Sequence, residues 1–378
     1  MKRNGFTLIE LLAVIVILAI IALIATPIVL DIIDDSKESS IKRSIELYGG
    51  AVENAVAKAQ LNGQAIPSGK YTTEDGKTLT QGDTTLKVDY NGAKTVCDVY
   101  ISSEGTVSLK KCNVSDKTIE YTYGNKIYEN GAVVYFDVTT GKSCDTYTET
   151  QSNIGVNSGC MKFYAFNDDG SDKVNLLLDH NTTAKIYWKN KDTDNTGTLG
   201  PGTTENVSGP KEVLEQLKTD TSSWIGTITP ENYSIDQSGQ GSNAKYTIDY
   251  SSYKARLITA QEVAQITGNT IFDEKTSSST FYFDTNTNTA STTCKSGDTS
   301  GCKYGWLYDR TNKECTTNGC LNNSDIVTYG YWTISPLASN SKNAWFVFFG
   351  GHLGGGFVDD GSLCGVRPVI TVLKSKLT

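Results

Sequence analysis

The chain has 378 residues, of which 38% are hydrophobic and 20% are charged. This balance excludes an intrinsically disordered chain, and the length leaves room for two domains. The net charge of −8 and isoelectric point near 5.0 argue against a nucleic-acid partner, since no basic block stands out. Tyrosine is abundant (20) and methionine is scarce (2), which is typical of β-rich extracellular domains with many turns.

The first predicted element is an apolar helix. Residues 6–30 form a run long enough to cross a membrane, and Lys2 and Arg3 favour a cytoplasmic N-terminus. A secretory signal peptide is an alternative, because residues 25–27 loosely match a small-residue cleavage site. Glu10 argues against it, because a carboxylate in a membrane helix costs about 2.5–3.5 kcal/mol and needs a partner.

Residues 5–12 strongly resemble the class III signal of type IV prepilins. The resemblance implies that a prepilin peptidase removes the leader, residues 1–5, by cleaving between Gly5 and Phe6, and that Phe6 is then N-methylated. It also implies that Glu10 pairs with the new amino terminus of a neighbouring pilin subunit. That pairing would neutralise two charges that otherwise lie bare in lipid or in a filament core.

A single helix is predicted over residues 6–63. In the type IV pilins that the signal resembles, the helix kinks or melts locally at the position of Pro27, because proline removes a helical N–H group. Beyond it the pattern is amphipathic, and Asn62-Gly63 is a natural stop. Apolar residues recur at three- or four-residue steps and are expected to pack on the chain's own sheet: Ile41, Ile45, Tyr48, Val52, Val56 and Ala59.

Residues 64–118 predict a small antiparallel head. Strands are expected at 86–90, 96–101 and 106–109, and the last two form a hairpin around residues 103–105. The arrangement resembles the small sheet that packs on a pilin helix.

The 9 cysteines predict disulfides, which persist only in oxidising compartments. Four sequence-adjacent pairs leave Cys364 over, although sequence cannot fix connectivity: Cys97/Cys112, Cys144/Cys160, Cys294/Cys302 and Cys315/Cys320. A zinc site is the rival interpretation. Only Cys315 and Cys320 approach ligand spacing, however, and no CxxC motif or paired histidine supports them.

Residues 119–378 predict a large mixed α/β module with long loops, which makes the whole chain α+β. Strands are expected at 133–137, 162–166, 174–178 and 255–259, helices at 211–218 and 260–266, and surface loops at 191–210 and 275–303. Thr259 and Glu262 form a capping box at the start of the second helix.

The end of the chain resembles C-type-lectin-like domains of the formylglycine-generating-enzyme type. The resemblance rests on residues 331–336, on Asn343-Ala344-Trp345 and on residues 365–370, with residues 256–259 as the preceding element. It implies a mixed α/β fold with much irregular loop, in which the last residues form a strand of the core.

Residues 346–364 also resemble the variable region of proteins diversified by retroelements. Each residue between the scaffold positions has a codon that can be reached from an Asn codon by changing adenines alone. The alternative is an ordinary glycine-rich loop and strand. Ligand contacts are predicted at Phe346, Phe348, Phe349, His352, Phe357, Asp359, Asp360 and Leu363.

Strand alternation divides the aromatic residues of this segment between two faces. Trp345 and Val347 are expected in the core, and Phe346 and Phe348 on the surface. The alternative is that all the phenylalanines are core residues.

An enzyme is not expected, and neither a cofactor nor a metal is predicted. His180 and His352 are the only histidines, and no nucleophile elbow, zinc helix or phosphate loop is present. The oxidases among the formylglycine-type relatives use reactive cysteines, whereas the cysteines here pair. Residues 192–197 faintly resemble a calcium loop but lack its terminal glutamate, and an Asx-rich turn explains them.

These observations favour a minor or tip pilin that acts as an adhesin. Its C-terminal domain would bind an unknown protein or glycan ligand through residues 346–364, while its helix binds other pilin subunits. The protein would lie in the cell membrane before assembly and then in an extracellular pilus. Two alternatives stay open: a pseudopilin or major pilin with a structural role in secretion, DNA uptake or filament assembly, and a formylglycine-type enzyme.

Overall fold

The computed structural model describes residues 8–119, 121–145, 159–190, 205–285, 294, 299–308, 329–361 and 364–377. The chain divides into two compact units, Met1–Lys126 and Ile127–Thr378. The sequence predicted this boundary after residue 118, whereas in the structure it lies after Lys126. The reason is that the Tyr121 and Tyr123 hydroxyls donate to Glu46 and Glu53 at 2.9 Å and hold this stretch to the first unit.

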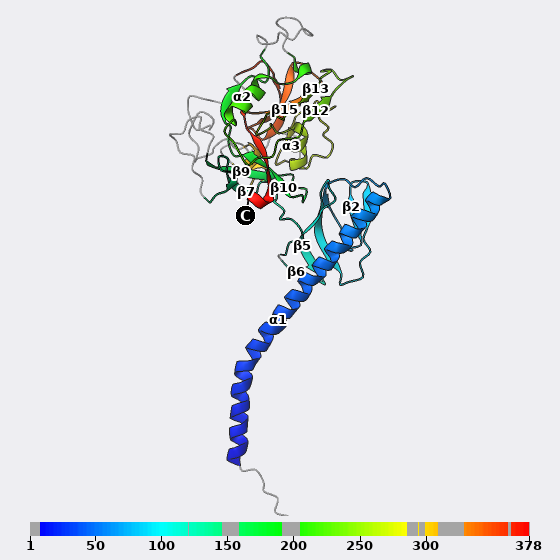
Figure 1. The fold of residues 1–378 in the computed structure, drawn as a ribbon, viewed down its shortest axis with the longest axis vertical. Coiled ribbons are helices and arrows are strands. Elements are labelled where there is room, and N and C mark those ends of the chain that lie inside the picture. Colours follow the sequence, from blue (N-terminus) through cyan, green and yellow to red (C-terminus); the bar gives the residue numbers. More distant parts are fainter. Residues whose placement is uncertain are drawn as a thin grey trace, which may run out of the picture. The chain divides into compact units, whose positions relative to one another are not determined.

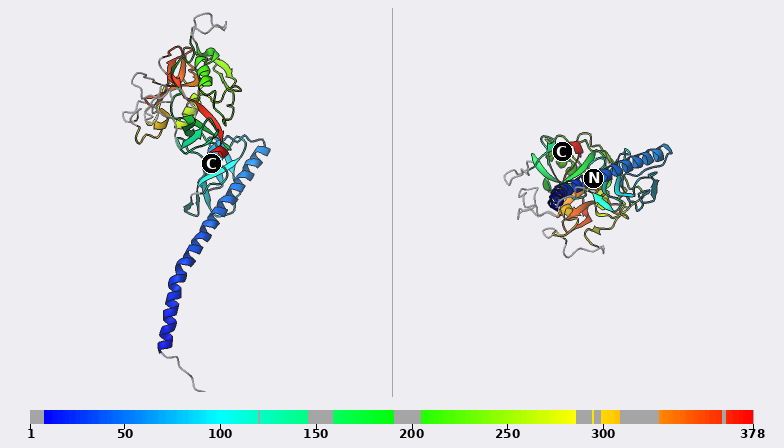
Figure 2. Two further views of the ribbon diagram at one scale, coloured as in Figure 1. Left: turned by 60° about the vertical axis from the view of Figure 1, so that its left-hand side comes forward. Right: turned by 90° about the horizontal axis from the view of Figure 1, so that it is seen from below.

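The first unit is one long helix and a small sheet. The helix is α1, Leu8–Leu61, and the strands are β1 Gly69–Tyr71, β2 Thr78–Gln81, β3 Thr84–Lys87, β4 Thr95–Ile101, β5 Val107–Val114 and β6 Lys117–Ile119. An antiparallel sheet has the order β1-β4-β5-β6, and β2 and β3 form a separate hairpin. Figures 1 and 2 show these strands along the C-terminal half of α1.

The apolar stripe of α1 packs on this sheet, as predicted. Ile45, Tyr48 and Val52 are fully buried, in one cluster with Tyr71 and Leu109 of the strands. Burial of each such side chain contributes about 1.5–3 kcal/mol, so packing rather than helix propensity holds this half of the helix.

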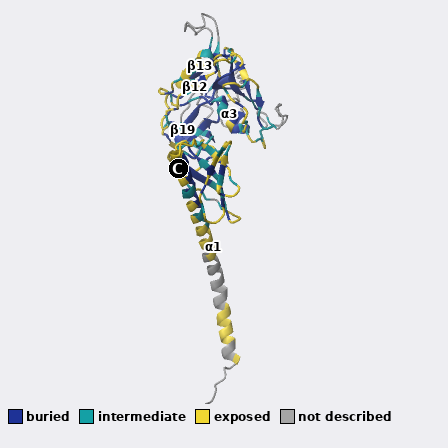
Figure 3. Ribbon diagram, turned by 90° about the vertical axis from the view of Figure 1, so that its right-hand side faces the viewer, coloured by how far each residue is buried: buried dark blue, intermediate teal, exposed yellow. Residues whose placement is uncertain are grey.

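The N-terminal half of α1 is different. Residues 12–19 and 33–40 are exposed (Figure 3). The helix runs through Pro27 without a break. Among the described residues, which leave out the side chains of 9–11 and 20–32, no helix is both long and apolar enough to cross a membrane. The membrane span predicted at residues 6–30 stays a prediction.

The second unit contains short helices and many strands. Its helices are α2 Glu212–Asp220, α3 Ala260–Thr267 and α4 Gly305–Tyr308, with 3₁₀ turns η2 Asn206–Ser208 and η3 Lys374–Lys376. Its strands are β7 Val133–Asp137, β8 Lys142–Ser143, β9 Cys160–Phe166, β10 Lys173–Leu178, β11 Thr183–Ile186, β12 Tyr233–Asp236, β13 Lys245–Ile248, β14 Phe281–Tyr282, β15 Gly330–Pro336, β16 Asn343–Phe348, β17 His352–Phe357, β18 Cys364–Val366 and β19 Val369–Leu373.

These strands form two larger sheets and one hairpin. A five-stranded sheet has the order β19-β10-β9-β7-β8, a six-stranded sheet has the order β11-β18-β15-β16-β17-β14, and β12 pairs with β13. Only β15 and β18 pair in parallel among the described strands. The final strand, β19, joins the core through β10, as expected. The chain is therefore mixed α plus β, and the specific C-type-lectin-like fold is not confirmed.

Both faces of the six-stranded sheet are covered. One core contains Trp332 and Phe346 together with residues of α2 and of the five-stranded sheet. The other contains Tyr331, Trp345 and Val347 together with residues of α3. Successive residues of β15 and β16 therefore point into opposite cores.

The predicted capping box at α3 is present. The Thr259 side chain accepts from the Glu262 backbone N–H, and the Glu262 carboxylate accepts from that of Thr259. The same carboxylate also binds Arg256 through two hydrogen bonds of 2.6 and 2.7 Å. The strand predicted at 255–259 was wrong, because only Arg256 bridges to Val369.

Three of the predicted disulfides are formed: Cys97–Cys112, Cys144–Cys160 and Cys294–Cys302. Cys364 is free and buried. Cys315 and Cys320 lie outside the described residues, so their pairing stays a prediction.

Two adjacent helix glycines give a matched test of the first unit. A Cβ at Gly49 would lie 2.4 Å from the Tyr123 ring, whereas one at Gly50 would meet nothing within 4 Å. Gly49→Ala should destabilise α1 by about 1 kcal/mol or more through overpacking. Gly50→Ala should stabilise it by about 0.5–1 kcal/mol through helix propensity.

Hydrogen exchange of the amides of residues 45–60 in the full-length protein measures this difference. Protection should fall in the first variant and rise in the second. Equal effects of the two substitutions would contradict the packing described here.

Candidate functional site

The residues predicted for processing and assembly lie at the edge of what the structure describes. Gly5 and Phe6 fall outside the described residues. Glu10 and Pro27 belong to α1, but nothing of their side chains is described. Their roles stay predictions.

Most residues predicted for ligand binding lie on the β16–β17 hairpin and the loop after it. Trp345 and Val347 are fully buried, as expected. Phe346 and Phe349 were predicted on the binding surface and are only 7% and 5% exposed, so that prediction was wrong. Phe346 packs in the core that contains Trp332, on the face of β16 that alternation alone assigned to solvent, and Phe349 packs in the core that contains Trp345. Leu363 lies outside the described residues.

Phe348 and His352 instead belong to a row of half-exposed rings that crosses three strands. Strand pairing places His352 between Phe348 of β16 and Tyr282 of β14. The centroid of the His352 ring lies 4.6 Å from the centroid of the Phe348 ring and 4.8 Å from that of the Tyr282 ring. Tyr329 continues the row, with its ring 6.2 Å from Phe348 at an interplanar angle of 8°. Tyr282, His352, Phe348 and Tyr329 are called the aromatic row below.

Glycines keep the rings of this row uncrowded. The partner of Phe348 on β15 is Gly330, which adds no side chain beside the ring. At Gly350 the Phe348 ring occupies the space of a side chain, since a Cβ there would lie 2.4 Å from it. The row therefore presents aromatic surface, with Tyr329 45% exposed.

The environment of His352 favours the neutral form of its imidazole. Burial lowers the pKa of its imidazole from the ordinary value of 6.5, against a smaller opposing effect of the Gly350 backbone. Its Nδ1 atom is buried and has no hydrogen-bond partner.

A second candidate surface lies at the other end of β17. Phe357, Asp359 and Asp360 line an open pocket together with Lys185 and Tyr187. Phe357 is 56% exposed and Asp359 is exposed, in agreement with their predicted place on the surface.

A third candidate surface is a pocket of about 850 Å³ that lies beside the aromatic row. Its wall includes Tyr282 of the row and a run of hydroxyl-bearing residues that ends at β14: Thr276, Ser277, Ser278, Ser279 and Thr280. This hollow is called the hydroxyl-rich pocket below.

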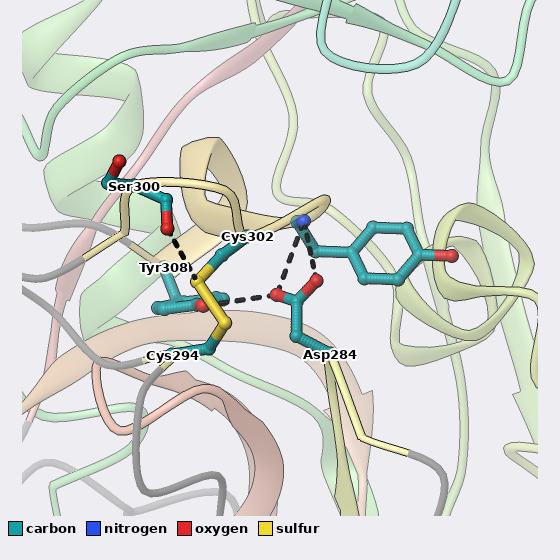
Figure 4. Close-up of a disulfide and its surroundings, with 6 residues drawn as sticks. Asp284, Cys294, Ser300, Cys302 and Tyr308 are labelled. Atoms are coloured by element: carbon teal, nitrogen blue, oxygen red, sulfur yellow. Dashed lines mark hydrogen bonds between the residues drawn. A yellow bond between two sulfur atoms is a disulfide. The ribbon is translucent and has the colours of Figure 1, made fainter.

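One group in the described part of the chain has the geometry of a metal site: Asp284, Cys294 and Cys302 offer ligand atoms within 4.8 Å of one another. Figure 4 shows the two sulfurs joined as a disulfide. The Asp284 carboxylate accepts from the Tyr304 backbone N–H and the Tyr308 hydroxyl. With the sulfurs bonded to each other, the arrangement holds the loop in place and offers no thiolate. The suggested calcium loop at 192–197 lies outside the described residues.

Cys364 and Arg367 lie in the interior. Burial raises the pKa of the Cys364 thiol well above its ordinary value, which disfavours the nucleophilic thiolate. Arg367 is 1% exposed and donates to the backbone carbonyls of Leu178, Asp179, Trp306 and Leu307. It ties three segments of the second unit together.

Comparison with known protein families finds one family that matches part of the chain. Residues 1–26 match the family described as the prokaryotic N-terminal methylation motif. The chain therefore carries a type IV pilin-like prepilin signal, which implies processing by a prepilin peptidase and assembly with pilin subunits in general. No curated protein and no solved structure matches the chain.

Sequence reasoning missed Tyr282, Tyr329, Lys185 and Tyr187. Tyr282 and Tyr329 reach His352 and Phe348 only through strand pairing, and no local pattern announces it. The one usable signal was the dipeptide Tyr329-Gly330, which comes directly before the aromatic residues Tyr331 and Trp332.

Replacing His352 should make the second unit less sensitive to acid. Because burial lowers the folded-state pKa of His352, the unfolded chain binds this proton more readily. Stability should fall as the pH drops from about 7.5 to about 5.5, through the unfolded-state pKa. In His352→Gln this decrease should be smaller.

Urea unfolding followed by tryptophan fluorescence measures the effect, since all 5 tryptophans lie in the second unit. An equally large loss of stability in the variant would show that His352 does not contribute.

Proposed function

We propose that the protein is a minor or tip type IV pilin that acts as an adhesin. The prepilin signal at residues 1–26 supports insertion of α1 into a pilus. The observation that carries the adhesin role is the half-exposed aromatic surface of the second unit, where Phe348, His352 and Tyr329 lie on a closely packed sheet. Exposed aromatic surface of this kind marks binding sites.

The first unit supports the same proposal. A helix whose residues 12–19 and 33–40 are exposed and whose C-terminal half carries a buried stripe suits a subunit that assembles through one half and folds around the other. In this proposal Glu10 pairs with the amino terminus of a neighbouring subunit, and the protein passes from the cell membrane to an extracellular pilus.

The second unit would be a binding module of lectin-like type and not an enzyme. The buried Cys364, whose thiolate is disfavoured, supports the absence of cysteine-based oxidation. Diversification of residues 346–364 belongs to the proposal as well. The described scaffold positions of this segment are buried, including Val347, Leu353 and Val358. Of the positions between them, Phe357 and Asp359 are exposed, whereas Phe346, Phe349 and Cys364 are buried.

Blocking the cleavage site should abolish incorporation into pili. Gly5→Val places a branched side chain before the cleaved bond, so the chain should keep residues 1–5 and should not carry N-methylated Phe6. Mass spectrometry of the purified chain detects both changes. Normal cleavage and methylation in this variant would contradict the predicted processing site.

Labelling of the native pilus distinguishes a tip adhesin from a shaft subunit. Immunogold against the second unit should mark the ends of pili sparsely. Uniform labelling along the shaft would contradict the tip role and favour a major subunit.

Adhesion tests the binding face. Phe348→Ala together with His352→Ala should reduce adhesion of piliated cells, while the number of pili per cell stays normal. Unchanged adhesion at normal piliation would contradict the proposed face.

A further inference from the structure

The chemistry of the aromatic row and of the hydroxyl-rich pocket narrows the class of ligand. The two surfaces are continuous, because Tyr282 belongs to the row and also lines the pocket. Three of the row's four rings stand on neighbouring strands, which lie about 4.8 Å apart in a sheet. The surface is therefore long enough for more than one small ring.

The row offers ring faces that are only partly covered. Tyr329 and Phe348 are stacked in nearly parallel planes, with 8° between them and 6.2 Å between their centroids, and His352 is tilted by 38° to Phe348. Phe346 lies edge-on to Phe348 at 6.0 Å and is buried, so it supports the row from below. Because this support already fixes the Phe348 ring, little further side-chain entropy is lost when a ligand binds.

The pocket beside the row offers hydroxyl groups. Thr276, Ser278 and Ser279 are exposed along its wall, and each hydroxyl can both donate and accept a hydrogen bond. The volume of about 850 Å³ lies within the range of small-molecule sites.

The combined surface is poor in available charge. Asp284, on the pocket wall, already accepts hydrogen bonds from Tyr304 and Tyr308. Lys303 lies over the Tyr304 ring, 4.9 Å from its centroid. The net charge of −8 further disfavours an anionic ligand.

A ligand that matches this surface has flat apolar faces, many hydroxyl groups at its edges and no net charge. A lipid would need an apolar groove without the hydroxyl wall, and a nucleic acid would bring phosphates. Pyranose rings combine an apolar C–H face, which stacks on aromatic rings, with equatorial hydroxyls.

We propose that the aromatic row and the hydroxyl-rich pocket form one binding surface for an uncharged oligosaccharide. Sugar rings stack on Tyr329 and Phe348, and their hydroxyls bond within the pocket beside Tyr282. This inference rests on the proposed adhesin function and names its ligand.

The experiment measures adhesion of cells that carry the full-length protein in their pili. Target cells are untreated, oxidised with periodate, which cleaves the vicinal diols of sugars, or treated with sialidase, which removes charged terminal sugars. Periodate should abolish adhesion and sialidase should leave it unchanged. Adhesion that survives periodate would overturn the carbohydrate ligand, and adhesion lost with sialidase would overturn its lack of charge.

Variants connect the ligand to the surface. Tyr329→Ala removes the most exposed ring of the row and should weaken adhesion by about tenfold or more, as for a central aromatic contact. Ile225→Ala removes an apolar side chain that is 49% exposed and belongs to neither surface, so it serves as the control with unchanged adhesion. Equal adhesion by both variants would overturn the assigned surface.

Direct binding measurements with purified protein complete the test. Full-length protein in detergent is titrated with the neutral hexasaccharides chitohexaose, maltohexaose and mannohexaose, and with polysialic acid as the charged comparison. Binding to a neutral chain that Tyr329→Ala weakens supports the inference. Binding to polysialic acid alone overturns it. Absence of adhesion to untreated cells is a separate result, because it contradicts the proposed function itself.

Discussion

The six-stranded sheet of the second unit has to fill two hydrophobic cores at once, and most of that unit depends on this constraint. Its central strands, β15 and β16, carry large side chains on both faces, so α2 and the five-stranded sheet cover one side and α3 the other. Among the described residues of this sheet, the exposed rings and polar groups lie at its margins, near β11 and β14 and at the ends of β15, β16 and β17. The candidate binding surfaces lie there because the centre has no exposed face.

Arg367 shows how the irregular parts are held to this framework. A buried guanidinium is costly unless its donors are paired, and here they meet backbone carbonyls from the loop after β10 and from α4. Tyr331 lies against its face, with 4.9 Å between the guanidinium carbon and the ring centroid. One side chain therefore satisfies carbonyl groups at the end of β10, in the loop after it and in the short helix α4.

The sequence was most informative where local pattern and packing agree. The spacing of Ile45, Tyr48 and Val52 predicted the buried face of α1, and Thr259 with Glu262 predicted the start of α3. Disulfides between near neighbours followed from the same locality. Prediction failed for Phe346, because alternation in one strand does not reveal whether a second layer covers it, and for Phe349, which packs in the same core as Trp345. The aromatic row was only half predicted, since Tyr282 and Tyr329 reach it through pairing between segments far apart in the chain.

The glycines of β17 also bear on how this protein could change over evolutionary time. A Cβ at Gly356 would lie within 3.2 Å of the rings of Trp332 and Phe346, so this position has almost no freedom. Gly355 is exposed and would meet only the end of the Leu337 side chain, at 3.0 Å. Variation among sister sequences should therefore be uneven, with little at Gly356 and more at exposed positions such as Gly355 and Phe357. New specificities would arise by exchanging rim side chains while the glycine backbone beneath them stays fixed.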